Sequence, residues 1–182
     1  MIAKIIEDMN NALKNNLYFA ALSLVLILPD ICGKAEYPDN KYIGNRYRDW
    51  FKTYVEPSDK SIKDQESMSE FTCLTGEVVY SLRNFFIHQG TPNIKIEKFD
   101  HFEFIIESKK EFNVYAGSLS ISNDKRKKLS INIHYLCSII GNVALQYYKK
   151  NKDKFNFIKY QILDFDKIIK SYQNKIIILM TL

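Results

Sequence analysis

The residues from Leu82 to Gly90 are the part of the chain whose types and spacing suit chemistry. Arg83, Asn84 and His88 stand there at the end of an apolar helical pattern, shortly before a glycine. The guanidinium of an arginine is a permanent planar cation that matches phosphate oxygens. The imidazole of a histidine accepts or donates a proton near neutral pH. Together these side chains would suffice to cleave a phosphodiester without a metal.

The spacing within this motif argues for two copies of the helix. On a regular α-helix five residues advance the chain by roughly 140° beyond one turn, so Arg83 and His88 do not share a stripe. Asn84 and His88, four residues apart, do. One helix alone therefore makes a poor pocket, and we expect two helices to line one cleft. Because the motif lies near a helix end, we expect the melting temperature to change little when either Arg83 or His88 is replaced by alanine.

Apolar residues at helical spacing predict helices on both sides of the motif. The first is expected to begin at Ile2 and to end before Pro29, since a proline cannot continue the hydrogen-bond ladder. Residues 29–44 are expected to form a loop and 47–55 a short helix with a core-facing stripe. The polar stretch 56–69 separates that helix from the motif helix. The motif helix would bury Leu74, Val78, Leu82, Phe85 and Phe86.

An alternating pattern follows the motif helix. Phe102, Phe104 and Ile106 alternate with other residues, two of them glutamates, and this period of two is that of a strand. Turn-like segments then leave 114–121 and 129–133 as two further strands. The economical interpretation is a three-stranded β-meander.

The rest of the chain returns to a helical period. Helices are expected at 135–150 and 155–169, and the apolar end 176–180 is expected to be buried against the domain or a partner. We therefore expect one domain, residues 1–182, of the α+β class and mainly α, with the β-meander inserted at about 94–133.

The end of the motif helix resembles a known family. A helix that finishes with an arginine, a polar residue and a histidine five positions after the arginine is similar to the HEPN superfamily (higher eukaryotes and prokaryotes nucleotide-binding domain). Arg83, Asn84 and His88 stand at the three motif positions. The segment 28–51, which begins Leu-Pro-Asp-Ile-Cys-Gly-Lys, also resembles an uncharacterised bacterial group. In that group such a loop precedes a leucine–arginine helix ending in histidine.

The resemblance implies a fold and an activity. HEPN domains are small antiparallel helical bundles, usually dimeric, and many are metal-independent endoribonucleases of toxin–antitoxin, phage-defence and CRISPR systems. The likeness covers about residues 2–92 and, more loosely, the helix from Tyr135 onward. It implies a homodimeric ribonuclease that needs no cofactor, takes RNA as its substrate and has an antitoxin protein as a further partner. The β-meander is not part of the minimal family bundle.

The implied roles can be assigned residue by residue. Arg83 would hold the phosphate in a bidentate fork, His88 would move protons, and Asn84 would orient the histidine or the phosphate. Three residues are expected to bind substrate at the edge of the cleft, where Glu36 could join them: Asp30, Lys34 and Arg46. The alternative from another functional class is a catalytically silent module that binds RNA or a protein. A third possibility is a site masked by its partner.

Each motif residue also has an ordinary structural interpretation. His88 could cap a helix C-terminus, Arg83 could pair with Glu77 or another carboxylate, and Asn84 could be a surface polar residue. Asp30 could organise its loop through bonds to the backbone. These alternatives differ from the catalytic ones in whether the side chains face an open cleft.

A metal site has little support in the spacing. His101 alternates with strand residues and His134 stands at a strand-to-helix junction, so neither forms a His-x3-His pair with another histidine. Cys32, Cys73 and Cys137 are odd in number and widely spaced, which favours reduced thiols over disulfides or zinc.

The charge and hydropathy of the sequence bear on its partners and its cellular location. Residues 149–182 hold eight lysines against three aspartates, which accounts for the whole net charge of +5. This basic segment could guide RNA, although a solvated helix face is the simpler interpretation. The apolar run 17–28 is too short for a bilayer, and the chain start does not suit a signal peptide. We therefore expect a cytoplasmic protein without a membrane partner.

Overall fold

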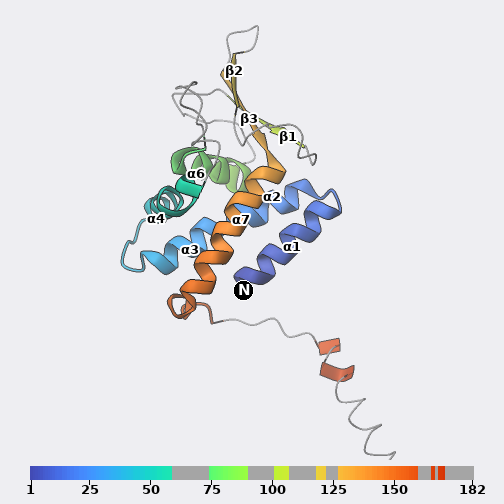
Figure 1. Cartoon of the computed structure of the whole chain (residues 1–182), viewed down its shortest axis with the longest axis vertical. Coiled ribbons are helices and arrows are strands. Elements are labelled where there is room, and N and C mark those ends of the chain that lie inside the picture. The colour runs from blue at the N-terminus through green and yellow to red at the C-terminus, as the bar shows by residue number, and fades with distance from the viewer. Residues whose placement is uncertain are drawn as a thin grey trace, which may run out of the picture.

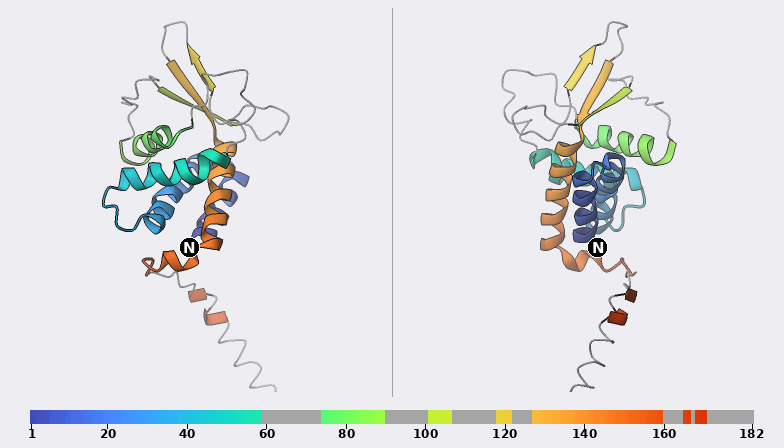
Figure 2. Two further views of the ribbon diagram at one scale, coloured as in Figure 1. Left: turned by 60° about the vertical axis from the view of Figure 1, so that its left-hand side comes forward. Right: turned by 90° about the vertical axis from the view of Figure 1, so that its right-hand side faces the viewer.

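The computed structural model describes residues 1–58, 74–89, 101–106, 118–121, 127–159, 165–166 and 168–170. Within this part the chain is α+β and mainly α, as expected. The helices pack together and a small sheet lies at one end of them (Figure 1). The N-terminus lies at the opposite end in all three ribbon views (Figures 1 and 2).

The first predicted helix is in fact two. α1 spans Ile2–Lys14 and α2 spans Tyr18–Leu26. Between them Asn16 has a φ of 58°, in the left-handed region, where a right-handed helix cannot continue. Asparagine tolerates this conformation better than most residues, and the chain uses it to turn α2 back against α1.

The prediction of a loop at 29–44 is wrong for its first half, which is helical. α3 spans Leu28–Glu36, with Pro29 in its first turn. A proline is well placed there because the amides of the first turn have no helical partner to lose. Asp30 and Lys34 therefore lie on a helix, and only residues 37–42 connect it to the next one.

The short helix predicted at 47–55 is confirmed. α4 spans Ile43–Trp50 and continues as a π-helical turn, η1 (Phe51–Val55), and a 3-10 turn, η2 (Glu56–Ser58). The predicted stripe faces the core, with Tyr54 half-buried at its edge. The polar stretch after residue 58 lies outside the described residues up to residue 73.

Two glycines allow α4 to lie against its neighbours at backbone distance. A Cβ added at Gly33 of α3 would stand 2.6 Å from the carbonyl oxygen of Arg46. One added at Gly76 would stand 2.8 Å from the carbonyl oxygen of Arg48. Both contacts are too short for a side chain, so glycine is required where α3 and the motif helix pack on α4.

The motif helix forms where the pattern predicts it. α6 spans Gly76–Asn84, and Thr75 caps it by accepting a hydrogen bond from the amide of Val78 at 3.4 Å. It continues as a second π-helical turn, η3 (Phe85–Gln89). Leu82 is fully buried, and the other predicted core residues of this helix are buried or half-buried. Gly90 lies outside the described residues.

The sheet differs from the predicted meander. β1 (His101–Ile105), β2 (Ser118–Ile121) and β3 (Lys127–Asn132) are arranged in the order β1-β3-β2. β3 pairs antiparallel with β2, as in a hairpin, but parallel with β1. In the central strand β3, Leu129 and Ile131 are fully buried. Alternation alone could not reveal this order, since it fixes the faces of a strand and not its neighbours.

The last long helix joins the sheet to the other helices. α7 spans Ile133–Lys150 and follows directly from β3, with Asn132 capping it through the amide of Tyr135 at 3.1 Å (Figure 1). It packs against α1, α2, α3 and η1. The largest fully buried side chains of the core are Trp50, Tyr47, Phe51, Ile2, Met9, Leu22, Leu26, Leu28 and Leu82 together with Leu129, Ile131 and Ile133.

The helix predicted to start at Phe155 does not start there. Phe155 ends a 3-10 turn, η4 (Lys152–Phe155), and the described residues 156–159 are not helical. Phe155 is buried against the aromatic core, which ties the chain down after α7. Residues 165–166 and 168–170 are helical, and the apolar end 176–180 lies outside the described residues.

One described stretch has the length and composition of a membrane-spanning helix. It runs from Tyr18 to Glu36 near the N-terminus, with a mean hydropathy of 1.5. Half of it is buried inside the protein, and the core helices of soluble proteins have the same property. The stretch is therefore weak evidence for a membrane location, and the cytoplasmic location stays a prediction.

Candidate functional site

Arg83 and Asp30 form an ion pair that joins α6 to α3. The Nη2 atom of Arg83 lies 2.7 Å from Oδ2 of Asp30, and Nε donates to the same oxygen at 3.0 Å. Only 16% of the arginine side chain and 19% of the aspartate side chain are exposed. Two predicted site residues that are far apart in the sequence are thus brought together in a partly dry setting, where charge-assisted hydrogen bonds are strong.

Asn84 completes the arrangement around the guanidinium. Its Oδ1 atom accepts a hydrogen bond from Nη1 of Arg83 at 3.0 Å. The guanidinium is therefore bound on two sides, by the carboxylate of Asp30 and by the amide of Asn84. This fixes the orientation of a side chain that has many rotamers when exposed.

The pair rests beside a buried phenol. Tyr47 is fully buried, and its hydroxyl donates to the carbonyl oxygen of Leu26 at 3.2 Å. Burial raises the pKa of Tyr47 well above its ordinary value, and the nearby charge of Asp30 raises it further, while Arg83 opposes this. Tyr47 is therefore a neutral wall of the site and cannot serve as a base at physiological pH.

The winding of the helix changes between Arg83 and His88. α6 ends at Asn84, and His88 belongs to the π-helical turn η3. In a π-turn each residue advances the chain by less than the 100° of an α-helix, because the hydrogen bond spans one residue more. The angular offset between the two backbone positions is therefore smaller than the roughly 140° expected for a regular helix. The side chain of His88 lies outside the described part.

The other two predicted substrate residues bond to the loop that follows α3. Lys34 donates from Nζ to the carbonyl oxygen of Pro38 at 3.1 Å, and the Nη1 atom of Arg46 donates to the carbonyl oxygen of Asn40. These bonds organise the 37–42 connection, a role that had been considered for Asp30. Lys34 and Arg46 thus have local partners, whereas Asp30 joins the motif.

Arg83 does pair with a carboxylate, as its ordinary structural interpretation required, but the carboxylate is that of Asp30 and not that of Glu77. The carboxylate of Glu77 instead pairs with Nε of Arg48 at 3.1 Å on an exposed face. The two acids differ in position because Asp30 approaches α6 from α3, whereas Glu77 lies in the first turn of α6 itself.

A second polar cluster, which the sequence did not indicate as a unit, surrounds Glu36 at the end of α3. Its carboxylate accepts from the hydroxyl of Tyr54 at 3.0 Å, from the hydroxyl of Tyr147 at 2.6 Å and from Nζ of Lys154 at 2.6 Å. These partners lie on η1, α7 and η4. The cluster therefore ties the C-terminal end of α7 to α3, and Lys154 is part of the fold rather than a solvated charge.

The Glu36 cluster shifts the acidity of its members. Burial by itself raises the pKa of Glu36, but the hydrogen bonds from Lys154, Tyr147 and Tyr54 outweigh it and the pKa lies below its ordinary value. Burial and the bond to Glu36 raise the pKa of Tyr54 to about 12 and that of Tyr147 further. A stable anion held by neutral phenols is a structural arrangement rather than an acid–base pair for catalysis.

The thiols are unsuited to chemistry. Cys32 and Cys137 are buried and free, and burial raises the pKa of the Cys137 thiol to about 12 and that of Cys32 also upward. A thiol with such a pKa is a weak nucleophile at neutral pH. Cys73 lies outside the described residues.

In the described part of the chain no group of three or more histidine, cysteine, aspartate or glutamate side chains is placed to hold a metal ion.

No protein-family model, no curated protein and no solved structure matches the chain.

Proposed function

We propose that this chain is a HEPN-like domain that acts as a metal-independent endoribonuclease in a homodimer, of the kind found in toxin–antitoxin and phage-defence systems. The observation that carries the proposal is the Arg83–Asn84 pair, held by Asp30 at the point where the helix passes into the π-turn that contains His88. π-turns are rare and recur at functional sites. The helical part of the fold would be a variant of the HEPN bundle, with the sheet as an addition.

The proposed reaction is a transfer of the phosphodiester to the neighbouring 2′-oxygen. His88 of one protomer removes the proton of the 2′-hydroxyl, and the oxygen attacks the phosphorus to form a 2′,3′-cyclic phosphate. The bond to the 5′-oxygen breaks, and the imidazole of the second protomer gives that oxygen a proton. Arg83 stabilises the charge that builds on the phosphate oxygens. No metal is required, because protons and charge are both handled by side chains.

The proposed reaction calls for a homodimer. One motif helix carries one imidazole, whereas the reaction uses a base and an acid, so two helices complete the site. Light scattering at micromolar protein should give about twice the chain mass of 21.4 kDa. A clean monomer would remove the composite site.

The Arg83–Asp30 pair favours a second candidate, a catalytically silent module that binds RNA or a protein. Nε of Arg83 donates a hydrogen bond to the carboxylate of Asp30, and Nη2 lies 2.7 Å from the same oxygen. These two atoms form the edge of the guanidinium that a phosphate would use in a bidentate contact. A nuclease must exchange part of this pairing for the substrate. A silent module would keep it.

Cleavage of a single-stranded RNA in excess EDTA separates the two candidates. The nuclease should cut it, and Arg83→Lys, assayed where it remains folded, should slow cleavage by roughly 100-fold or more, as when one oxyanion donor is lost, because lysine keeps the charge without the fork. RNA that is bound but not cut by the wild type would favour the silent module.

A further inference from the structure

The first turn of α2 lies between the start of α7 and the end of the motif helix. The ring of Tyr18 meets the ring of His134 edge-on, with centroids 5.8 Å apart, and the ring of Phe19 stacks on Phe86 of η3 at the same separation. Consecutive helical residues point about 100° apart, so one turn of α2 can face both elements. This places an aromatic pair directly beside the π-turn that contains His88.

Phe19 combines a ring contact with high solvent exposure. Its ring lies at only 20° to that of Phe86, yet 68% of the residue is exposed. Phe86 is in turn fixed edge-on against Phe104 of β1, with centroids 6.2 Å apart. The Phe19 ring thus lies nearly parallel to a neighbouring ring, while most of the residue is open to solvent. A flat, preorganised aromatic face is the surface on which an unpaired base stacks.

A pocket adjoins this ring through Tyr18. It has a volume of about 480 Å³ and is lined by Asn10, Leu13, Lys14, Asn16, Tyr18 and His134. None of the lining residues is acidic, Lys14 is cationic, and the hydroxyl of Tyr18 bonds to Oδ1 of Asn16 at 2.8 Å. The pocket therefore offers a lysine, amides and an imidazole to an anion, with no carboxylate in its lining to repel it.

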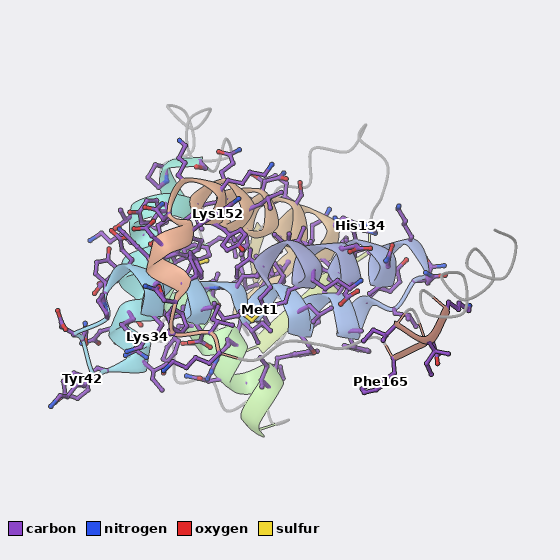
Figure 3. All side chains as sticks on the ribbon, turned by 90° about the horizontal axis from the view of Figure 1, so that it is seen from below. Met1, Lys34, Tyr42, His134, Lys152 and Phe165 are labelled. Atoms are coloured by element: carbon purple, nitrogen blue, oxygen red, sulfur yellow. The ribbon has the colours of Figure 1, made fainter. Side chains whose placement is uncertain are left out.

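This end of the protein is distinct from the end that carries the other predicted substrate residues. His134 lies at one end of the helices, whereas Lys34 and Tyr42 lie at the other (Figure 3). The Phe19 ring contacts η3 through Phe86, and the neighbouring Tyr18 joins the pocket to the start of α7 through His134. Lys34 bonds to the 37–42 connection.

We propose that single-stranded RNA binds across this surface, with a base stacked on Phe19 and a neighbouring phosphate in the Lys14–His134 pocket. The proposal rests on the ribonuclease function above and names where its substrate enters. A second copy of the chain is the competing occupant of an exposed phenylalanine. RNA is favoured because the pocket next to the ring carries a lysine and an imidazole and has no carboxylate in its lining, which suits a polyanion.

The test measures binding without cleavage. The full chain is titrated against a fluorescent 2′-O-methyl oligonucleotide, which has no free 2′-hydroxyl to attack the phosphate. Phe19→Leu keeps the apolar bulk but removes the aromatic face, and should weaken binding by about 5-fold or more, since one base stack is worth roughly 1–3 kcal/mol. Tyr42→Ala, which removes an aromatic residue that is 74% exposed at the other end, should leave the affinity unchanged.

Phe19→Trp supplies a direct signal. It should retain affinity, and its emission should be quenched by the oligonucleotide, because a base would cover the indole. The native Trp50 is fully buried and is the only other tryptophan, so the wild type provides the background.

The outcomes separate this proposal from the proposed function. If the Phe19→Leu protein binds RNA like the wild type, the proposed stacking on Phe19 is refuted, whereas the proposed nuclease function is not affected. Phe19→Leu protein that falls from dimer to monomer in light scattering would assign the surface to a second copy instead. Wild-type protein that does not bind the oligonucleotide would overturn both.

Discussion

Removing the carboxylate of Asp30 should destabilise the protein by about 2–3 kcal/mol. Arg83 donates one hydrogen bond from Nε to an oxygen of this residue and makes an ion-pair contact with it from Nη2, and a hydrogen bond to a charged group contributes about 1.5–3 kcal/mol. Leaving one member of a fully buried pair alone costs about 3–5 kcal/mol. Because a sixth to a fifth of each side chain is exposed, water can reach the stranded guanidinium, so the cost falls below this range, to about 2–3 kcal/mol.

A double-mutant cycle measures the coupling directly. Asp30→Ala, Arg83→Met and the double variant are unfolded in urea, and the free energies of unfolding are compared. Each single change should cost about 2–3 kcal/mol, and the double variant should lose at least about 1 kcal/mol less than the sum, because the second change removes a charge that already lacks its partner. Glu77→Ala is the matched control, since its pair with Arg48 is on the surface and should contribute under about 1 kcal/mol.

Additive single changes, within about 0.5 kcal/mol, would refute the coupling. For the same reason we now expect Arg83→Ala to lower the melting temperature. The expectation that it would change little rested on the position of the motif near a helix end, whereas the Arg83 side chain is only 16% exposed and is paired. Loss of activity in Arg83 variants must therefore be measured at temperatures where they remain folded.

Three further outcomes are expected. Glu36→Gln should lower the melting temperature at neutral pH. Because folding lowers the pKa of Glu36, the stability that its carboxylate contributes is present above the ordinary glutamate pKa and is lost as the pH falls below it. The melting temperatures of the wild type and the variant should therefore converge in acid. Gly33→Ala should cost roughly 1–3 kcal/mol in chemical unfolding by forcing α3 away from α4. Reversing the charges of Lys149, Lys150 and Lys152 should weaken RNA binding and its dependence on salt in a fluorescence titration, and unchanged affinity would leave these lysines as a solvated face.

The sequence predicted elements well where hydrophobic periodicity decides them. α4 with η1, α6 and α7 form where the apolar spacing places them, since each must bury one stripe. It predicted poorly where a single residue acts through local geometry. Pro29 was interpreted as a terminator but begins a helix, and Asn16 was not recognised as a break because a left-handed asparagine leaves no trace in the apolar pattern.

The candidate site, too, could be predicted from the sequence only in part. The motif itself could be found because Arg83, Asn84 and His88 are close in sequence. The pairing of Arg83 with Asp30 could not be derived, because it depends on how α3 crosses α6 over 53 residues of separation. The bond between Glu36 and Lys154, over 118 residues, had no sequence signal for the same reason.

Cleavage of RNA by the His88→Ala protein in excess EDTA is the most direct test of the central claim. The wild type should cut single-stranded RNA under these conditions and leave 2′,3′-cyclic phosphate ends, identified by mass spectrometry of the products. The His88→Ala protein should be inactive while it keeps its circular dichroism spectrum and its oligonucleotide affinity. Cleavage that persists in the His88→Ala protein, or that disappears from the wild type when the chelator is added, would contradict a metal-independent mechanism centred on this histidine.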